Sequence, residues 1–176
     1  ALATRRYPLE VSWINAVALD GDIAIVTSYE AGVMLIPLDP GQPATVLSTT
    51  GNPQHPLSTP EGWLIPETGN FWEGCNAALE LLDPGAGTLE YVAAAPCISA
   101  ADGEDGPFQA SSYSGEMFLA NNESGLLRFP WTPPLIDVPT TTTLTTALWP
   151  EVPSFPVRLE RLGDVLYLLE DYSSSL

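Results

Sequence analysis

The segment Gly21–Pro43 reads GDIAIVTSYEAGVMLIPLDPGQP, and it decides the fold class. It contains two short apolar runs, DIAIVTSY and VMLIPL, which are separated by EAG and followed by the turn sequence DPGQP. Both runs have the length and the β-branched composition of strands, and Gly or Pro bounds each one. The nearly continuous apolar character of DIAIV predicts a strand that is covered on both faces. The segment therefore predicts an antiparallel hairpin.

The same order of turn and strand recurs along the 176 residues. Turn glycines that precede an apolar run stand 41, 53 and 48 residues apart, at Gly21, Gly62, Gly115 and Gly163. When Gly32 is aligned with Gly125, Pro37 falls on Pro130 and Pro40 falls on Pro133. A period of about 40–50 residues with up to four short strands per unit is typical of a β-propeller built from four-stranded antiparallel blades. The alternative is a β-sandwich in which the hairpins resemble one another by accident.

The units are assigned to residues 13–50, 54–98, 107–146 and 155–176 of a single propeller domain or fragment. Residues 1–12 are assigned to an outer strand of an adjacent or closing blade. Together the units make an incomplete ring of about three and a half blades. The fourth unit stops after a strong strand, which would leave an unpaired edge, so we expect further blades.

The first unit carries a recognisable set of residues, namely Gly21 to Val26, Gly32 to Ile36, Asp39, Pro40 and Pro43. With these it resembles the LVIVD-type repeat of bacterial secreted and cell-surface β-propellers. The second unit lacks the glycine before its third strand, and the third unit has Thr132 in place of the turn aspartate. The resemblance covers most of the chain, but its motifs are structural, so it implies an architecture and no reaction.

The charge of the chain limits its partners. All five basic residues are arginine and 22 residues are acidic, which gives a net charge of −17. Such a field repels phosphate groups and excludes nucleic acid and anionic membrane surfaces as partners. No apolar run reaches the ~18–20 residues that a transmembrane helix needs. Cations and basic proteins remain as ligands, although solubility alone also explains the charge.

Two cysteines, Cys75 and Cys97, flank the hairpin of the second unit. If Leu82 faces Leu89, Cys75 faces Pro96, and a small bulge would bring it opposite Cys97. A disulfide there would stabilise the fold by about 3 kcal/mol and would indicate an oxidising compartment, so we expect a secreted, periplasmic or cell-surface protein. Two buried thiols or a metal site are the alternatives, although two cysteines without a nearby histidine pair make a poor zinc motif.

In a propeller, the loops after the second strands and those before the first strands lie on one face. These segments supply the candidate ligand-binding residues Tyr29, Glu30, His55, Glu67, Trp72, Glu73, Asn121 and Glu123. A carboxylate near the end of the second strand of each unit predicts an acidic ring for Ca²⁺ or a cationic ligand. Asp102, Glu104 and Asp105 are candidate metal ligands, although their spacing lacks the terminal Glu of an EF-hand. Polar loops in a Glu-rich chain explain the same residues without a ligand.

The sequence contains few signs of catalysis. His55 is the single histidine, and as a general base it would use Glu67 or Glu73 as an orienting partner. No G-x-S-x-G, G-x-G-x-x-G or P-loop pattern occurs. The sequence therefore predicts a non-catalytic binding or assembly module for a protein, a carbohydrate or further blades, with Ca²⁺ as the one candidate cofactor. The alternative is a sugar- or lactone-type hydrolase or lyase with an acidic site, with or without a metal, at the channel mouth.

Overall fold

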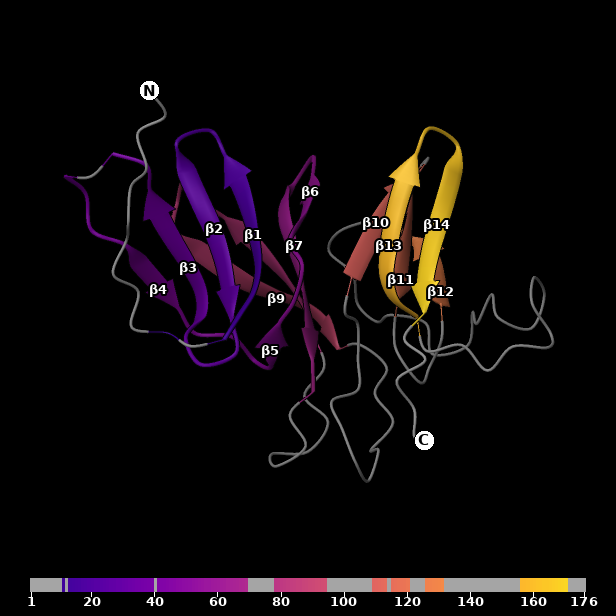
Figure 1. The fold of residues 1–176 in the computed structure, drawn as a ribbon, viewed down its shortest axis with the longest axis horizontal. Helices are drawn as coiled ribbons and strands as arrows, with labels where there is room; N and C mark the ends of the chain where they lie inside the picture. Colours follow the sequence, from indigo (N-terminus) through magenta and orange to yellow (C-terminus); the bar gives the residue numbers. More distant parts are fainter. Residues whose placement is uncertain are drawn as a thin grey trace.

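The computed structural model describes residues 11, 13–39, 41–69, 78–94, 109–113, 115–120, 126–131 and 156–170. These residues form four antiparallel sheets and contain no helix (Figure 1). The predicted all-β class with several antiparallel sheets is confirmed.

Each sheet is made by strands that follow one another closely in sequence. Sheet 1 contains β1 (Ile14–Asp20), β2 (Ile23–Ser28), β3 (Gly32–Pro37) and β4 (Thr45–Leu47). Sheet 2 contains β5 (Asn52–Pro53), β7 (Gly62–Thr68), β8 (Ala78–Asp83) and β9 (Thr88–Ala94), and β6 (Leu57–Thr59) also pairs with β7. Sheet 3 contains β10 (Gln109–Tyr113), β11 (Glu116–Ala120) and β12 (Leu126–Pro130), and sheet 4 contains β13 (Pro156–Leu162) and β14 (Val165–Glu170).

Glycines make the turns of the predicted hairpins. The four turn glycines named above all have positive φ, with values of 54, 147, 78 and 62° in chain order. At Gly32 a second constraint applies, because an added Cβ would lie 2.4 Å from the carbonyl oxygen of Leu47. In the second hairpin Leu82 pairs with Leu89 as predicted. A β-bulge shifts the register between Leu79 and Glu80, near the start of β8.

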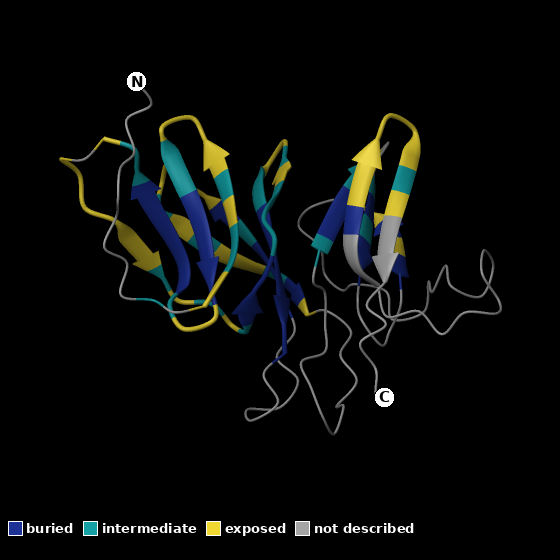
Figure 2. Ribbon diagram, in the orientation of Figure 1, coloured by how far each residue is buried: buried dark blue, intermediate teal, exposed yellow. Residues whose placement is uncertain are grey.

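The sheets stack face to face in sequence order, and β7 shows how. Leu64 and Ile65 are both fully buried, and as neighbours in a strand they point to opposite faces. Ile65 packs in a cluster with Ile25 of sheet 1, whereas Leu64 packs in a cluster with Met117 of sheet 3. Sheet 2 is therefore buried on both faces, which explains the uninterrupted apolar runs. Figure 2 shows the buried residues along β2, β3 and β7 and the exposed turns at the strand ends.

Sheets 3 and 4 pack in the same manner. Ala120 and Leu126 of sheet 3 form a buried cluster with Leu159 of sheet 4. In Figure 1 sheets 1 and 2 occupy the left of the molecule and sheets 3 and 4 the right. The described core thus lies at the interfaces between consecutive sheets, together with a cluster of Val26, Met34 and Ile36 on the other face of sheet 1.

Polar groups connect the first strands of successive sheets. The Nδ2 atom of Asn15 in β1 donates to Asn52 Oδ1 at 2.7 Å and to the carbonyl oxygen of Pro53 at 2.8 Å, both in β5. His55 forms an isolated parallel bridge with Gln109 of β10. The side chain of Gln109 in turn accepts the backbone N–H of Leu159 in β13 at 3.1 Å. The first strands of the four sheets therefore lie side by side.

Candidate functional site

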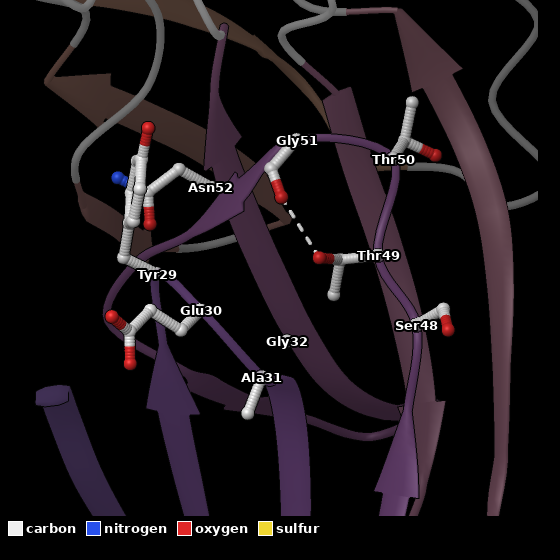
Figure 3. A pocket seen from close by; sticks show the side chains of 9 residues that line it. All are labelled: Tyr29, Glu30, Ala31, Gly32, Ser48, Thr49, Thr50, Gly51 and Asn52. Carbon is white, nitrogen blue, oxygen red and sulfur yellow. Dashed lines mark hydrogen bonds between the residues drawn. The ribbon is translucent and has the colours of Figure 1, made fainter. Parts of the chain in front are cut away.

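A polar pocket of about 270 Å³ lies where sheet 1 connects to sheet 2 (Figure 3). Two segments form it, the turn between β2 and β3 and the connection between β4 and β5. They contribute Tyr29, Glu30, Ala31 and Gly32 on one side and Ser48, Thr49, Thr50, Gly51 and Asn52 on the other. The volume lies just below the roughly 300–1,000 Å³ of pockets for drug-sized ligands, so the pocket suits a smaller group.

Local hydrogen bonds shape the turn that carries Tyr29 and Glu30. The hydroxyl of Ser28 accepts the backbone N–H groups of Glu30 at 3.3 Å and Ala31 at 3.4 Å. Serine in such a position closes a turn without a further backbone partner. The N–H of Tyr29 donates to the carbonyl oxygen of Trp13 at 3.1 Å, which ties the turn to the start of sheet 1. Both sequence-predicted residues of this turn, Tyr29 and Glu30, therefore line the pocket.

The opposite wall is the segment Ser48–Asn52. The hydroxyl of Thr49 donates to the carbonyl oxygen of Gly51 at 2.8 Å, the dashed contact in Figure 3. Asn52 is buried and receives the Asn15 amide described above. Sequence reasoning missed this wall, because small polar residues between two strands are typical of any loop.

A pair of buried carboxyl groups lies directly behind this wall. The backbone N–H of Gly51 donates to Glu67 Oε2 at 2.7 Å, and the hydroxyl of Thr50 donates to Glu80 Oε1 at 2.7 Å. Glu67 is fully buried and Glu80 is 5% exposed. Burial raises the pKa of Glu67 to about 9, and the hydrogen bond and the charge of Glu80 act in the same direction. Glu67 therefore keeps its proton at neutral pH.

The position of Glu67 corrects the expectation that it lies in a ligand-binding loop. It lies within β7, and its side chain offers no exposed surface to a ligand. Its partner Glu80 was not predicted, because a glutamate between leucines in a strand gives no sign of which carboxyl it will meet. The only sequence signal for Glu80 was the alternation of faces in β8, which places Glu80 on the opposite face from its two leucine neighbours.

The expected pairing of His55 with Glu67 is not found. The groups that shift the pKa of Glu67 are Glu80, Gly51 and Thr50, and His55 is not among them. The bridge to Gln109 instead places His55 where sheets 2 and 3 meet, and it does not line the pocket. Within the described residues no group of three or more His, Cys, Asp or Glu side chains is arranged to hold a metal ion.

The remaining candidate residues lie outside the described part of the chain. They are the predicted ligand-binding residues Trp72, Glu73, Asn121 and Glu123, the candidate metal ligands Asp102, Glu104 and Asp105, and the cysteines Cys75 and Cys97. Of the predicted acidic ring, Glu30 lines the pocket and Glu67 lies behind its wall.

Among the described residues no helix is long and apolar enough to cross a membrane. Comparisons of the chain with protein-family models, with curated proteins and with solved structures give no match.

Proposed function

We propose that the four sheets are consecutive blades of a β-propeller of the secreted or cell-surface kind that the sequence resembles. Three features support this proposal. The sheets follow one another in sequence order (Figure 1), sheet 2 is buried on both faces, and polar contacts link the first strands of neighbouring sheets. A propeller requires each of these features, because its blades pack face to face around inner strands.

We propose that the chain is a non-catalytic binding module whose ligand enters the pocket between the β2–β3 turn and Ser48–Asn52. The observation that carries this proposal is the polar lining of the pocket. Ser48 is part of the lining, and the hydroxyl of Thr49 keeps acceptor capacity after donating to Gly51. The half-exposed ring of Tyr29 supplies a flat apolar face beside these groups.

The ligand that fits these groups is a neutral or cationic polyhydroxylated unit, such as a sugar ring at the end of a glycan. Its hydroxyls pair with the threonine, serine and backbone groups, and its apolar face packs on Tyr29. The carboxylate of Glu30 and the net charge of −17 disfavour anionic ligands.

A glycan array probed with the labelled chain tests this function. Retention of neutral or amino sugars is expected, and Tyr29→Ala should abolish most of it. Tyr91→Ala is the matched control, because Tyr91 is also an exposed tyrosine but lies on β9, away from the pocket. Binding that Tyr91→Ala and Tyr29→Ala reduce equally would place the ligand elsewhere.

One observation favours the alternative, a hydrolase or lyase. Glu67 keeps a proton at neutral pH, as a general acid does. However, a substrate in the pocket would meet Thr50 and Gly51, since the carboxyl groups behind them are buried. We therefore propose binding rather than catalysis.

We also propose that Cys75 and Cys97 form a disulfide and that the protein works in an oxidising compartment, secreted, periplasmic or on the cell surface. The bulge in the β8–β9 hairpin shifts the register so that Ala78 pairs with Ala94. If this register continues for three residues beyond the described strands, Cys75 lies opposite Cys97. Opposite residues in an antiparallel pair have Cα atoms about 4.5–5.5 Å apart, which suits a disulfide. Two thiols that react in the denatured, unreduced protein would disprove the bond.

A further inference from the structure

The carboxyl groups of Glu67 and Glu80 face each other between sheets 1 and 2. In the β7–β8 register Ile65 is opposite Glu80 and Glu67 is opposite Ala78, so the two glutamates are diagonal neighbours on one face. This is the face on which Ile65 packs toward sheet 1. The sheet interface therefore encloses two carboxyl groups on the face that packs toward Ile25 of sheet 1.

One oxygen of each buried carboxyl group lacks a hydrogen-bond donor within the described part of the chain, and a shared proton would satisfy both. Among the described residues, Glu67 Oε1 and Glu80 Oε2 receive no N–H or O–H donor. Both carboxyl groups are buried and lie diagonally across one face of β7 and β8, and Glu80 contributes to the raised pKa of Glu67. Carboxylates only accept hydrogen bonds, so these two oxygens can satisfy each other only when one of the carboxyl groups is protonated. The pair carries one negative charge with the proton and two without it.

The other oxygen of each carboxyl holds the pocket wall. Gly51 donates its backbone N–H to Glu67 Oε2, and Thr50 donates its hydroxyl to Glu80 Oε1, both at 2.7 Å. Thr50 and Gly51 both line the pocket (Figure 3). The shared proton and the wall are thus connected through the same two side chains.

The described strands around the pair contain no cationic residue, and the single histidine, His55, lies in the connection between β5 and β6 and bridges to Gln109. The strands β2, β3, β4, β5 and β6 contain no titratable residue. On β8 and β9 the other titratable residues are Asp83, Glu90 and Tyr91, all of them exposed, and across the pocket lie Tyr29 and Glu30. Two buried carboxylates side by side would repel strongly, since burial removes the screening by water.

Building on the proposed binding role of the pocket, we propose that the Glu67–Glu80 pair is a proton-dependent latch on the wall Ser48–Asn52. The wall is held closed while the pair shares a proton. When the proton passes to solvent, the repelling carboxylates gain water only by releasing Thr50 or Gly51, and the wall opens. The pocket therefore binds its ligand more tightly as the pH falls.

Amide hydrogen exchange of Gly51, followed by NMR in the ligand-free full chain from pH 5 to pH 9, tests the latch. The protection factor of this N–H should fall with rising pH, by up to about tenfold per pH unit. In Glu80→Gln the side-chain NH₂ can donate to Glu67 and the second negative charge is absent, so the protection factor should fall much less steeply with pH. Glu90→Gln, which changes an exposed glutamate on β9, should keep the dependence of the unmodified chain.

A constant protection factor in the unmodified chain would overturn the proposal, and so would an unchanged pH dependence in Glu80→Gln. If Glu80→Gln does not fold, Glu67→Gln makes the mirror-image replacement and carries the same expectation. The experiment needs no ligand, so its outcome is separate from that of the glycan array. If the chain binds sugars but Gly51 exchange does not depend on pH, only the latch is disproved. If Gly51 exchange depends on pH as expected but no sugar binds, only the proposed ligand is disproved.

Discussion

The side-chain amide of Asn15 lies 2.7 Å from the amide oxygen of Asn52, and this contact joins the first strand of sheet 1 to the first strand of sheet 2. The same Nδ2 atom also donates to the carbonyl oxygen of Pro53. Asn52 and Pro53 are buried, so both hydrogen bonds are shielded from water.

Asn15→Ala should therefore lower the free energy of unfolding by about 1–3 kcal/mol, because it removes two hydrogen bonds to buried acceptors. Urea denaturation monitored by tryptophan fluorescence measures the change. Gln42→Ala, at an exposed position in the β3–β4 connection, is the control and should change stability by less than about 0.5 kcal/mol. Equal effects of the two substitutions would mean that the Asn15 contact contributes nothing.

Gly32→Ala should be much more damaging than Gly21→Ala. Both glycines have positive φ, but an added Cβ at Gly21 meets no atom within 4 Å, whereas at Gly32 it meets Leu47 O at 2.4 Å. We expect a loss of about 1–2 kcal/mol at Gly21, from backbone strain alone, and about 3 kcal/mol or more at Gly32. Thermal unfolding of the two variants compares them directly. Similar losses would show that β3 and the end of β4 are not packed as closely as described.

Stability should decrease as the pH rises from about 4.5 to about 9. The pKa of Glu67 is raised to about 9 in the folded chain from an ordinary value of 4.5, so the folded state binds the proton more tightly. Its contribution is complete below the unfolded pKa and is lost as the pH approaches the folded pKa, by up to about 1.4 kcal/mol per pH unit. Urea denaturation at pH 5, 7 and 8.5 should show this slope in the unmodified chain and a flatter one in Glu67→Gln. Parallel slopes would assign the pH dependence to the remaining carboxylates.

Double-mutant cycles should detect the contacts on each face of β7. Alanine at Ile65 or Leu64 should cost about 2–5 kcal/mol, since each side chain is fully buried. We expect coupling of about 0.5–3 kcal/mol for Ile65 with Ile25 and for Leu64 with Met117, and little coupling for the crossed pair of Ile65 with Met117. Valine in place of alanine at the isoleucines keeps the chain folded if the double variants unfold. Strong coupling in the crossed pair would contradict the stacking of sheets on opposite faces.

Much of the strand and turn arrangement could be predicted from residues that are close in the sequence. The turn glycines, the apolar runs between them and the pairing of Leu82 with Leu89 depend on residues close in sequence, and the structure contains all three. The alternation of Leu64 and Ile65 toward different sheets also follows from strand geometry once both faces are known to be covered.

Only one side of the pocket could be predicted from the sequence, because the other side depends on how sheets 1 and 2 meet. Tyr29 and Glu30 stand out in the sequence as polar residues that interrupt an apolar hairpin, and they line the pocket. Glu67 also follows an apolar run, but it is buried and lies beside Glu80. Both features depend on contacts with other strands, which the residues around Glu67 in the sequence do not reveal. The Ser48–Asn52 wall has no distinctive residue, and its role comes from the position of sheet 2 behind it.

The binding of sugars at the pocket is tested most directly by titrating the isotope-labelled chain at pH 6 with glucose, glucosamine and glucuronate in turn. These three probes share a ring and differ in charge. The account predicts that glucose and glucosamine shift the backbone NMR signals of Tyr29, Glu30 and Thr49–Asn52, that glucuronate shifts them less, and that Tyr29→Ala weakens the response at least tenfold. Shifts confined to other segments, the largest response to glucuronate, or no response to any of the three sugars would contradict it.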